Sequence, residues 1–132
     1  MIPDAAGLPN EQESVTLFHN PRCSTSRKAL QLLRDAGHEP GVVEYLETGW
    51  TRDQLEGLLA RLKARPADIL RRKEPLAREL GLTAGNASDH AILDAMVANP
   101  ILVERPIAVR GQRARVGRPP EAVLDLLHER GS

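Results

Sequence analysis

Short β-prone apolar runs alternate with amphipathic helical stretches along the first third of this chain. Residues 15–19 form an apolar run that ends at Asn20-Pro21, because proline cannot continue a central strand. Alanine and leucine then recur at helical spacing over residues 24–36, and Gly37 is placed as a C-cap. A second run over residues 42–46 predicts another strand. We expect these strands to be parallel, with the helix as a right-handed crossover.

The middle third of the chain is predicted to be helical throughout. Thr51 is placed as the N-cap of a helix that carries leucines on one face and ends before Arg65-Pro66. Residues 68–82 predict one or two short helices with a break at Glu74-Pro75, and Ser88 is placed as the cap of another helix. No strand is expected here, so this segment predicts a helical insertion.

The last third returns to β structure before a final helix. Residues 106–110 and 112–116 flank Gly111 and predict an antiparallel hairpin, and Pro119-Pro120 opens a helix. The order β-α-β, helical insertion, β-β-α predicts an α/β protein of thioredoxin topology with the insertion between its two halves. We expect a flexible N-terminal tail over residues 1–14 and a single domain over residues 15–130.

Composition narrows the range of partners. The chain has 132 residues, 41% of them hydrophobic, which is enough for one core without metals or disulfides. Its 18 basic and 18 acidic residues cancel, so no global charge favours nucleic acid or an anionic membrane. Charges interrupt every apolar run before the roughly 18 residues of a membrane span, and residues 1–14 lack the features of a secretory signal. We expect a cytoplasmic monomer without nucleic-acid or membrane partners.

The single cysteine, Cys23, lies in the loop between the first predicted strand and helix. Unpaired N–H groups and the positive dipole end of a helix N-terminus stabilise a thiolate and bind oxyanions. His19, Arg22 and Arg27 add positive potential in this reading. A lone intracellular cysteine is commonly an inert apolar residue, but arginine and serine beside Cys23 favour a reactive thiol. A zinc site needs four close ligands, which one cysteine and four scattered histidines do not supply, so we expect no metal.

The pattern His-Asn-Pro-x-Cys-x-x-Ser-Arg at residues 19–27 resembles the glutaredoxin-coupled arsenate reductase family, of the ArsC type and its YfgD-like subgroup. The resemblance continues at residues 45–47, 69–71, 99–107 and 117–124 and covers about residues 15–128. Several separated motifs in one order make coincidence improbable. The resemblance also implies a cis peptide bond before Pro106.

The resemblance implies roles for eight residues of this chain. Cys23 is the nucleophile, and the surrounding positions that would activate it are His19, Asn20, Ser26 and Arg27. Three arginines would bind the oxyanion substrate: Arg71, Arg105 and Arg118. The match at Arg71 is looser, because a shift of one position in the run Arg71-Arg72-Lys73 would make Arg72 the contact. Bidentate guanidinium groups suit this task, since they offset the repulsion between an oxyanion and a thiolate.

The implied activity is the reduction of arsenate to arsenite through a covalent thiol-arsenate intermediate. The chain has no second cysteine to resolve that intermediate, so glutathione is expected as co-substrate and glutaredoxin as the protein that recycles the mixed disulfide, with no bound cofactor. Two alternatives stay open. A glutathione-dependent monothiol transferase would use Cys23 without the three arginines. A non-catalytic thiol regulator of the Spx type, which contacts RNA polymerase, commonly carries Cys-x-x-Cys, where this chain has Ser26.

Overall fold

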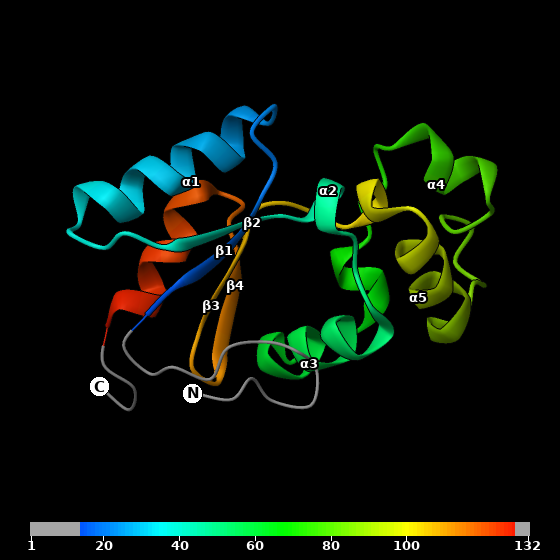
Figure 1. The fold of residues 1–132 in the computed structure, drawn as a ribbon. Helices are drawn as coiled ribbons and strands as arrows, with labels where there is room; N and C mark the ends of the chain where they lie inside the picture. The colour runs from blue at the N-terminus through cyan, green and yellow to red at the C-terminus, as the bar shows by residue number, and fades with distance from the viewer. Residues whose placement is uncertain (1–13, 129–132) are drawn as a thin grey trace.

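The computed structural model describes residues 14–128, in which four strands form one mixed sheet (Figure 1). The strands are β1 (Thr16–His19), β2 (Gly41–Glu44), β3 (Ile107–Arg110) and β4 (Arg113–Val116), in the order β2-β1-β3-β4. β1 is parallel to β2 and antiparallel to β3, and β3 and β4 form an antiparallel hairpin. The predicted β-α-β unit and hairpin are confirmed. Residues 1–13 of the expected tail, and 129–130 of the expected domain, lie outside the described residues.

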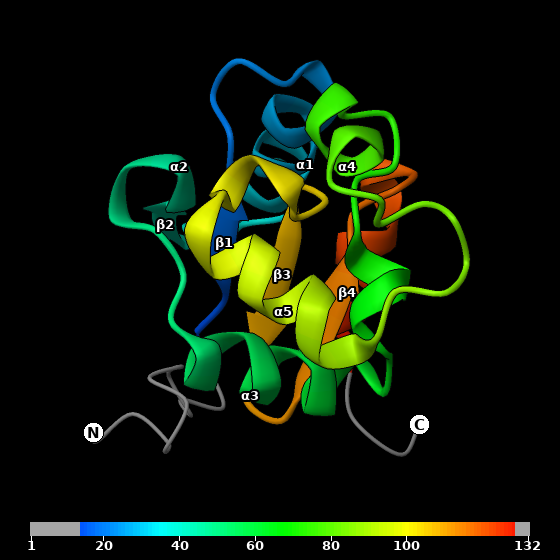
Figure 2. The same cartoon turned by 90° about the vertical axis from the view of Figure 1, so that its right-hand side faces the viewer.

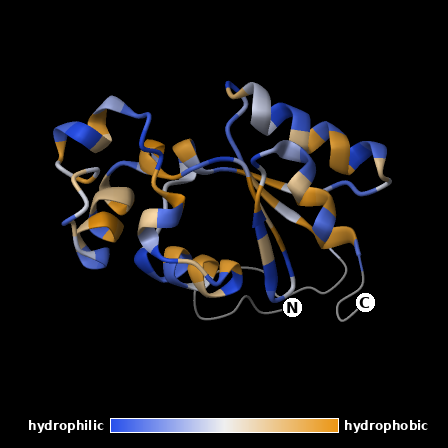
Figure 3. Ribbon diagram, turned by 180° about the vertical axis from the view of Figure 1, so that it is seen from behind, coloured by the Kyte–Doolittle hydropathy of each residue, from blue (hydrophilic) through white to orange (hydrophobic). Residues whose placement is uncertain are grey.

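One face of the sheet is covered by α1 (Ser24–Asp35) and the 3-10 helix η3 (Pro120–Leu127), as Figure 1 shows. Side chains alternate between the faces of a strand, so Leu17 packs against α1 and η3 while Phe18 packs on the opposite face. In Figure 3, hydrophobic and hydrophilic positions alternate along α1, as expected for a helix with one buried face. The last helix was predicted in the right place, but it is a 3-10 helix.

The helical insertion covers the other face. Its elements are α2 (Tyr45–Thr48), α3 (Arg52–Leu62), η1 (Pro66–Ile69), α4 (Pro75–Glu79), α5 (Asp89–Ala98) and η2 (Pro100–Leu102). In Figure 2, α5 lies in front of β3 and β4, and α2 lies beside β2. The insertion and the sheet share the larger core.

The predicted caps of this insertion are confirmed. Thr51 Oγ1 accepts the Gln54 N–H at 3.0 Å, and the Gln54 side chain accepts the Thr51 N–H at 3.0 Å, which completes a capping box. Ser88 Oγ accepts the Ala91 N–H at 3.0 Å. These side chains satisfy N–H groups that the first helical turn leaves without a backbone partner.

Two predictions about local structure were wrong. The second strand ends at Glu44, and Tyr45 begins α2 instead of continuing the strand. Tyr45 is fully buried and its hydroxyl donates to the Val103 carbonyl at 3.1 Å, so a tertiary contact overrides the local β propensity. The middle third is also not helical throughout, because Leu70 forms an isolated antiparallel β-bridge with Val103.

That bridge joins the segment after η1 to the segment before β3. Arg71 N–H donates to the Leu102 carbonyl at 2.7 Å, and Glu104 N–H donates to the Ile69 carbonyl at 2.8 Å. The bridge therefore brings Arg71 beside Glu104, a neighbour 33 positions away. The Arg105-Pro106 peptide bond is cis, as the family resemblance implies, and so is Arg118-Pro119.

Candidate active site

Cys23 is the N-cap residue of α1, at the end of a tight loop that follows β1. Its N–H donates to the Asn20 carbonyl at 3.0 Å, and its carbonyl accepts the Arg27 N–H of the first helical turn at 3.0 Å. The thiol is partly exposed. The position predicted from the sequence is confirmed, and it places the sulfur at the positive end of a twelve-residue helix.

The surroundings of Cys23 favour its thiolate. Burial by itself raises the pKa of the Cys23 thiol, but hydrogen bonding from the Ser26 backbone, hydrogen bonding from Arg105 and the charges of Arg105 and Arg118 outweigh it, so the pKa lies below its ordinary value. Arg118 Nη2 lies 3.6 Å from the sulfur as a donor. A larger share of the thiol is therefore ionised at neutral pH than in a free cysteine.

The structure gives His19 a positioning role instead of the expected role of adding positive potential beside Cys23. The side chain is 5% exposed, and burial, followed in size by an opposing influence of Glu44, leaves the pKa of His19 below 6.5. The imidazole is therefore mostly neutral at pH 7 and supplies little positive potential. Its Nδ1 lies 2.6 Å from Ser26 Oγ, and that hydroxyl also accepts the Asn20 N–H at 3.1 Å. His19 thus positions Ser26 at the start of α1.

The remaining polar groups of the loop hold its shape. Asn20 Oδ1 accepts the Arg22 N–H at 3.0 Å. Arg27 Nη1 donates to the Pro21 carbonyl at 3.0 Å from an exposed position. The four predicted activating residues lie in or directly beside this loop: His19 ends β1, Asn20 is in the loop, and Ser26 and Arg27 are in the first turn of α1. Their hydrogen bonds orient the backbone around the thiol.

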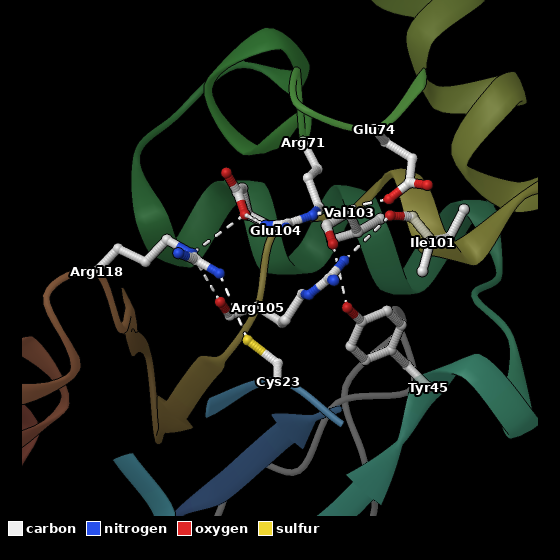
Figure 4. Close-up of polar contacts among 9 residues, drawn as sticks. All are labelled: Cys23, Tyr45, Arg71, Glu74, Ile101, Val103, Glu104, Arg105 and Arg118. Atoms are coloured by element: carbon white, nitrogen blue, oxygen red, sulfur yellow. Dashed lines mark hydrogen bonds and ion pairs between the residues drawn. The ribbon is translucent and has the colours of Figure 1, made fainter. Parts of the chain in front are cut away.

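Arg105 and Arg118 act on the Cys23 thiol, and Arg71 joins them through Glu104 (Figure 4). Arg118 Nε donates to the Arg105 carbonyl at 2.9 Å and lies 3.2 Å from Glu104 Oε1. Arg71 Nη1 donates to the same Glu104 oxygen at 3.2 Å. One carboxylate therefore ties two of the guanidinium groups together, and Arg118 also reaches the sulfur of Cys23.

Arg71 is the member of its arginine pair that the structure brings into this cluster. Its side chain is 18% exposed and faces Glu104, whereas Arg72 is exposed. A second carboxylate, Glu74, lies 3.8 Å from Arg71 Nε, which is an ion-pair distance but too long for a hydrogen bond. The sequence alone left both positions open.

Two N–H donors of the cluster are buried without a hydrogen-bond partner: Arg71 Nε and Arg105 Nε. Arg105 is 8% exposed, and its one hydrogen bond to a carbonyl, from Nη1 to Ile101, is long at 3.5 Å. Buried polar groups in folded proteins nearly always have partners, so orphaned donors call for an explanation. An oxyanion beside Cys23 would supply the missing acceptors.

Tyr45 and Glu104 are site residues to which the sequence analysis assigned no role. Burial raises the pKa of Tyr45 to about 12, and the nearby charge of Arg105 opposes that rise, so the phenol stays protonated. Its hydroxyl holds the Val103 carbonyl. Both residues lie in segments that carry the family resemblance, and Glu104 directly precedes Arg105. Its position next to Arg105 was the feature of the sequence that could have pointed to Glu104 as a site residue.

Residues 14–128 contain no group of three or more His, Cys, Asp or Glu side chains that could hold a metal ion. Within the same range, no helix is long and apolar enough to cross a membrane.

Known proteins are similar to this chain in both sequence and fold. Residues 18–126 match the ArsC family. The arsenate reductase ArsI1 of Synechocystis sp. is 47% identical over 116 residues, which are 88% of this chain and 81% of that protein. The uncharacterized protein YfgD of Escherichia coli K12 is 47% identical over 116 residues, 87% of this chain and 98% of that one.

The solved structure of an arsenate reductase from Vibrio cholerae has a TM-score of 0.82 to this fold at 44% identity, and the match covers 86% of this chain and 97% of that one. The fold is thus the thioredoxin-like fold with a helical insertion that the pattern predicted. A family match that spans the sheet, the insertion and the cysteine loop, together with these identities, shows that the chain belongs to the ArsC family.

Proposed function

We propose that this protein reduces arsenate to arsenite, with Cys23 as the nucleophile and Arg71, Arg105 and Arg118 as the oxyanion-binding groups. One observation carries the proposal: a partly exposed thiol of lowered pKa lies 3.6 Å from Arg118, in a cluster where two buried guanidinium donors lack hydrogen-bond partners. An anion that fits between these groups meets a nucleophile and compensating charge together. The names of relatives such as the arsenate reductase of Vibrio cholerae support the choice of substrate.

The chemistry follows from this arrangement. The Cys23 thiolate attacks arsenic(V) and displaces a hydroxyl group, which leaves a covalent thiol-arsenate adduct. The arginines hold the charge that develops on the arsenic oxygens in the transition state. Phosphate has nearly the same size and charge, so it competes for the same site, but a thiol does not reduce phosphorus(V).

The adduct needs an external thiol, because the chain has a single cysteine. Glutathione is the proposed co-substrate, glutaredoxin the protein that reduces the resulting mixed disulfide, and the cytoplasm the compartment that supplies both. No bound cofactor is required. Ser26 stands where a redox pair would place its second cysteine, and it is buried with its hydroxyl bonded to His19 and Asn20. This supports a positioning role over the redox switch of an Spx-type regulator.

Arsenate-dependent oxidation of NADPH tests the proposal when glutathione, glutaredoxin and glutathione reductase are added back one at a time. We expect turnover only with arsenate and a thiol donor present. Cys23→Ser should abolish it without changing the circular dichroism spectrum, since a partly exposed thiol contributes little packing. Substantial turnover by Cys23→Ser would refute the mechanism. Thiol transfer activity without arsenate reduction would favour the monothiol transferase.

A further inference from the structure

One carboxylate, Glu104, lies inside the arginine cluster formed by Arg71, Arg105 and Arg118. Its Oε1 lies 3.2 Å from Arg71 Nη1 and 3.2 Å from Arg118 Nε, and its side chain is only 22% exposed. A negative charge at this place opposes the binding of any anion. We propose that Glu104 determines specificity: it accepts a hydrogen bond from a hydroxyl of the bound anion, so that the site takes protonated tetrahedral oxyanions and rejects sulfate. The inference rests on the proposed function.

The first argument is that Glu104 keeps the capacity to accept a further hydrogen bond. Arg71 Nη1 donates one hydrogen bond to Oε1 at 3.2 Å. Arg118 Nε carries a single hydrogen, which it donates to the Arg105 carbonyl at 2.9 Å, so its contact with Glu104 is an ion pair. Within residues 14–128 the carboxylate makes no other hydrogen bond or ion pair. An ionised carboxylate has about four acceptor positions, and the protein occupies one of them with a hydrogen bond.

The second argument is that an anion beside Cys23 has Glu104 as a neighbour. The guanidinium group of Arg118 reaches both, since its Nη2 lies 3.6 Å from the sulfur and its Nε lies 3.2 Å from Glu104 Oε1 (Figure 4). An oxyanion that is hydrogen-bonded to this group therefore brings one of its oxygens close to the carboxylate. Two deprotonated oxygens in contact repel each other, whereas a proton between them makes a charge-assisted hydrogen bond.

The third argument is the balance of charge in the site. The charged side chains drawn in Figure 4 are three guanidinium groups, two carboxylates and one thiolate: Arg71, Arg105, Arg118, Glu74, Glu104 and Cys23. Positive and negative formal charges are therefore equal in number before an anion arrives. Excess positive charge does not select the ligand, so the match of hydrogen-bond donors and acceptors must.

That match describes a partly protonated anion. The guanidinium N–H groups, including the orphaned Nε of Arg71 and of Arg105, bind deprotonated oxygens, and Glu104 binds one that carries a proton. Arsenate and phosphate keep at least one hydroxyl at neutral pH. Sulfate has the same tetrahedral shape but no hydroxyl, so it would leave a deprotonated oxygen facing Glu104.

The binding test measures how well inorganic phosphate and sulfate protect Cys23 from iodoacetamide in the reduced full-length chain. A bound anion shields the sulfur because Arg118 contacts both, and this readout does not depend on arsenate turnover. At pH 7 and constant ionic strength, phosphate should protect at concentrations roughly tenfold to a hundredfold lower than sulfate, the range for a buried polar group that lacks its partner. Equal protection by the two anions would overturn the proposal.

Glu104→Gln tests the residue itself. The amide oxygen can still accept the hydroxyl of phosphate, and the amide N–H groups can donate to sulfate. Loss of the charge favours both anions, but only sulfate also escapes the contact between two deprotonated oxygens. The preference for phosphate over sulfate should therefore fall roughly tenfold or more, both in the protection of Cys23 and in the inhibition of arsenate turnover. A preference equal to that of the wild-type chain would refute the role of Glu104.

Glu74→Gln is the matched control, because it removes the same charge from the same cluster. Glu74 lies 3.8 Å from Arg71 Nε and, within residues 14–128, makes no ion pair with Arg118. This variant should change the binding of phosphate and of sulfate by the same factor and leave the preference as it is. A preference that falls equally in Glu74→Gln and Glu104→Gln would show a general effect of charge and refute the proposal.

The outcomes separate this proposal from the proposed function. A wild-type chain that turns over arsenate but binds sulfate as tightly as phosphate would refute the role of Glu104 and leave the reductase intact. A chain that neither turns over arsenate nor has its Cys23 protected by phosphate would refute the anion site, and with it both proposals.

Discussion

The protonation state of Cys23 decides when its thiol can act. Only the thiolate is nucleophilic, so reactivity rises with pH through the pKa of the thiol, and a lowered pKa moves that rise to lower pH. We expect the rate of iodoacetamide alkylation to reach half its maximum below the pH found for a free cysteine. Arg105→Ala should move the midpoint upward, because Arg105 contributes both a hydrogen bond and charge to the thiolate. A midpoint equal to that of free cysteine would leave Cys23 an ordinary residue.

The neighbouring pair Arg71 and Arg72 offers a matched comparison at one point of the chain. Arg71→Ala should lower kcat/KM for arsenate roughly tenfold to a hundredfold, the loss expected for a charge-assisted hydrogen bond of about 1.5 to 3 kcal/mol. Arg72→Ala removes an exposed charge and should change it little. Arg71→Lys should restore only part of the rate, because a point charge cannot replace the planar fork. Equal, small losses at both positions would remove Arg71 from the site.

In the proposed mechanism, Glu104 competes with the substrate for the guanidinium groups of Arg71 and Arg118. Its Oε1 lies 3.2 Å from nitrogens of both Arg71 and Arg118, and its side chain is 22% exposed. Glu104→Gln keeps the shape but removes a negative charge from the oxyanion site. We expect phosphate to inhibit about fivefold more tightly, which corresponds to about 1 kcal/mol for a partly exposed pair. Inhibition constants for phosphate measure this, and weaker inhibition would show that Glu104 mainly holds the arginines in place.

Secondary-structure elements were predictable where one local signal decides them. The proline after Asn20 ends β1, Thr51 and Ser88 cap helices, and Gly111 turns the β3–β4 hairpin, so each boundary follows from residues within a few positions. The same local signals placed Cys23 at the N-terminus of α1. The part of the site that lies in the β1–α1 loop was therefore predictable from the sequence.

Elements that depend on tertiary contacts were not predictable in this way. Tyr45 comes shortly after Val42 and Val43 and has high β propensity, yet burial of its ring and its bond to the Val103 carbonyl turn the chain into α2. The lowered pKa of His19 is likewise a consequence of burial that no neighbour in the sequence reveals. The choice between Arg71 and Arg72 depends on the Leu70–Val103 bridge, which joins segments far apart in the chain.

At the scale of the whole molecule, the arginine cluster depends on how closely two distant segments approach. Pro106 follows Arg105, and Gly117 precedes Arg118. The Gly117 N–H donates to the Pro106 carbonyl at 2.8 Å. A Cβ at Gly117 would lie 2.7 Å from Pro106 Cγ and 3.1 Å from Val123 Cγ1, so only glycine allows this approach. The distance between Arg105 and Arg118 is thus fixed by a packing contact next to each of them.

Gly117→Ala should therefore damage stability and substrate binding together. The proline ring is rigid, so the added methyl must push the segments of Gly117 and Pro106 apart. Overpacking of this kind costs about 1 to 3 kcal/mol in the free energy of unfolding. The same displacement separates Arg118 from the Arg105 carbonyl that it bonds at 2.9 Å, so the KM for arsenate should rise. Gly41→Ala is the control, since a Cβ there meets nothing within 4 Å. Urea unfolding and arsenate kinetics measure both effects, and a Gly117→Ala protein as stable and as active as Gly41→Ala would show that the cluster tolerates a wider gap between its two segments.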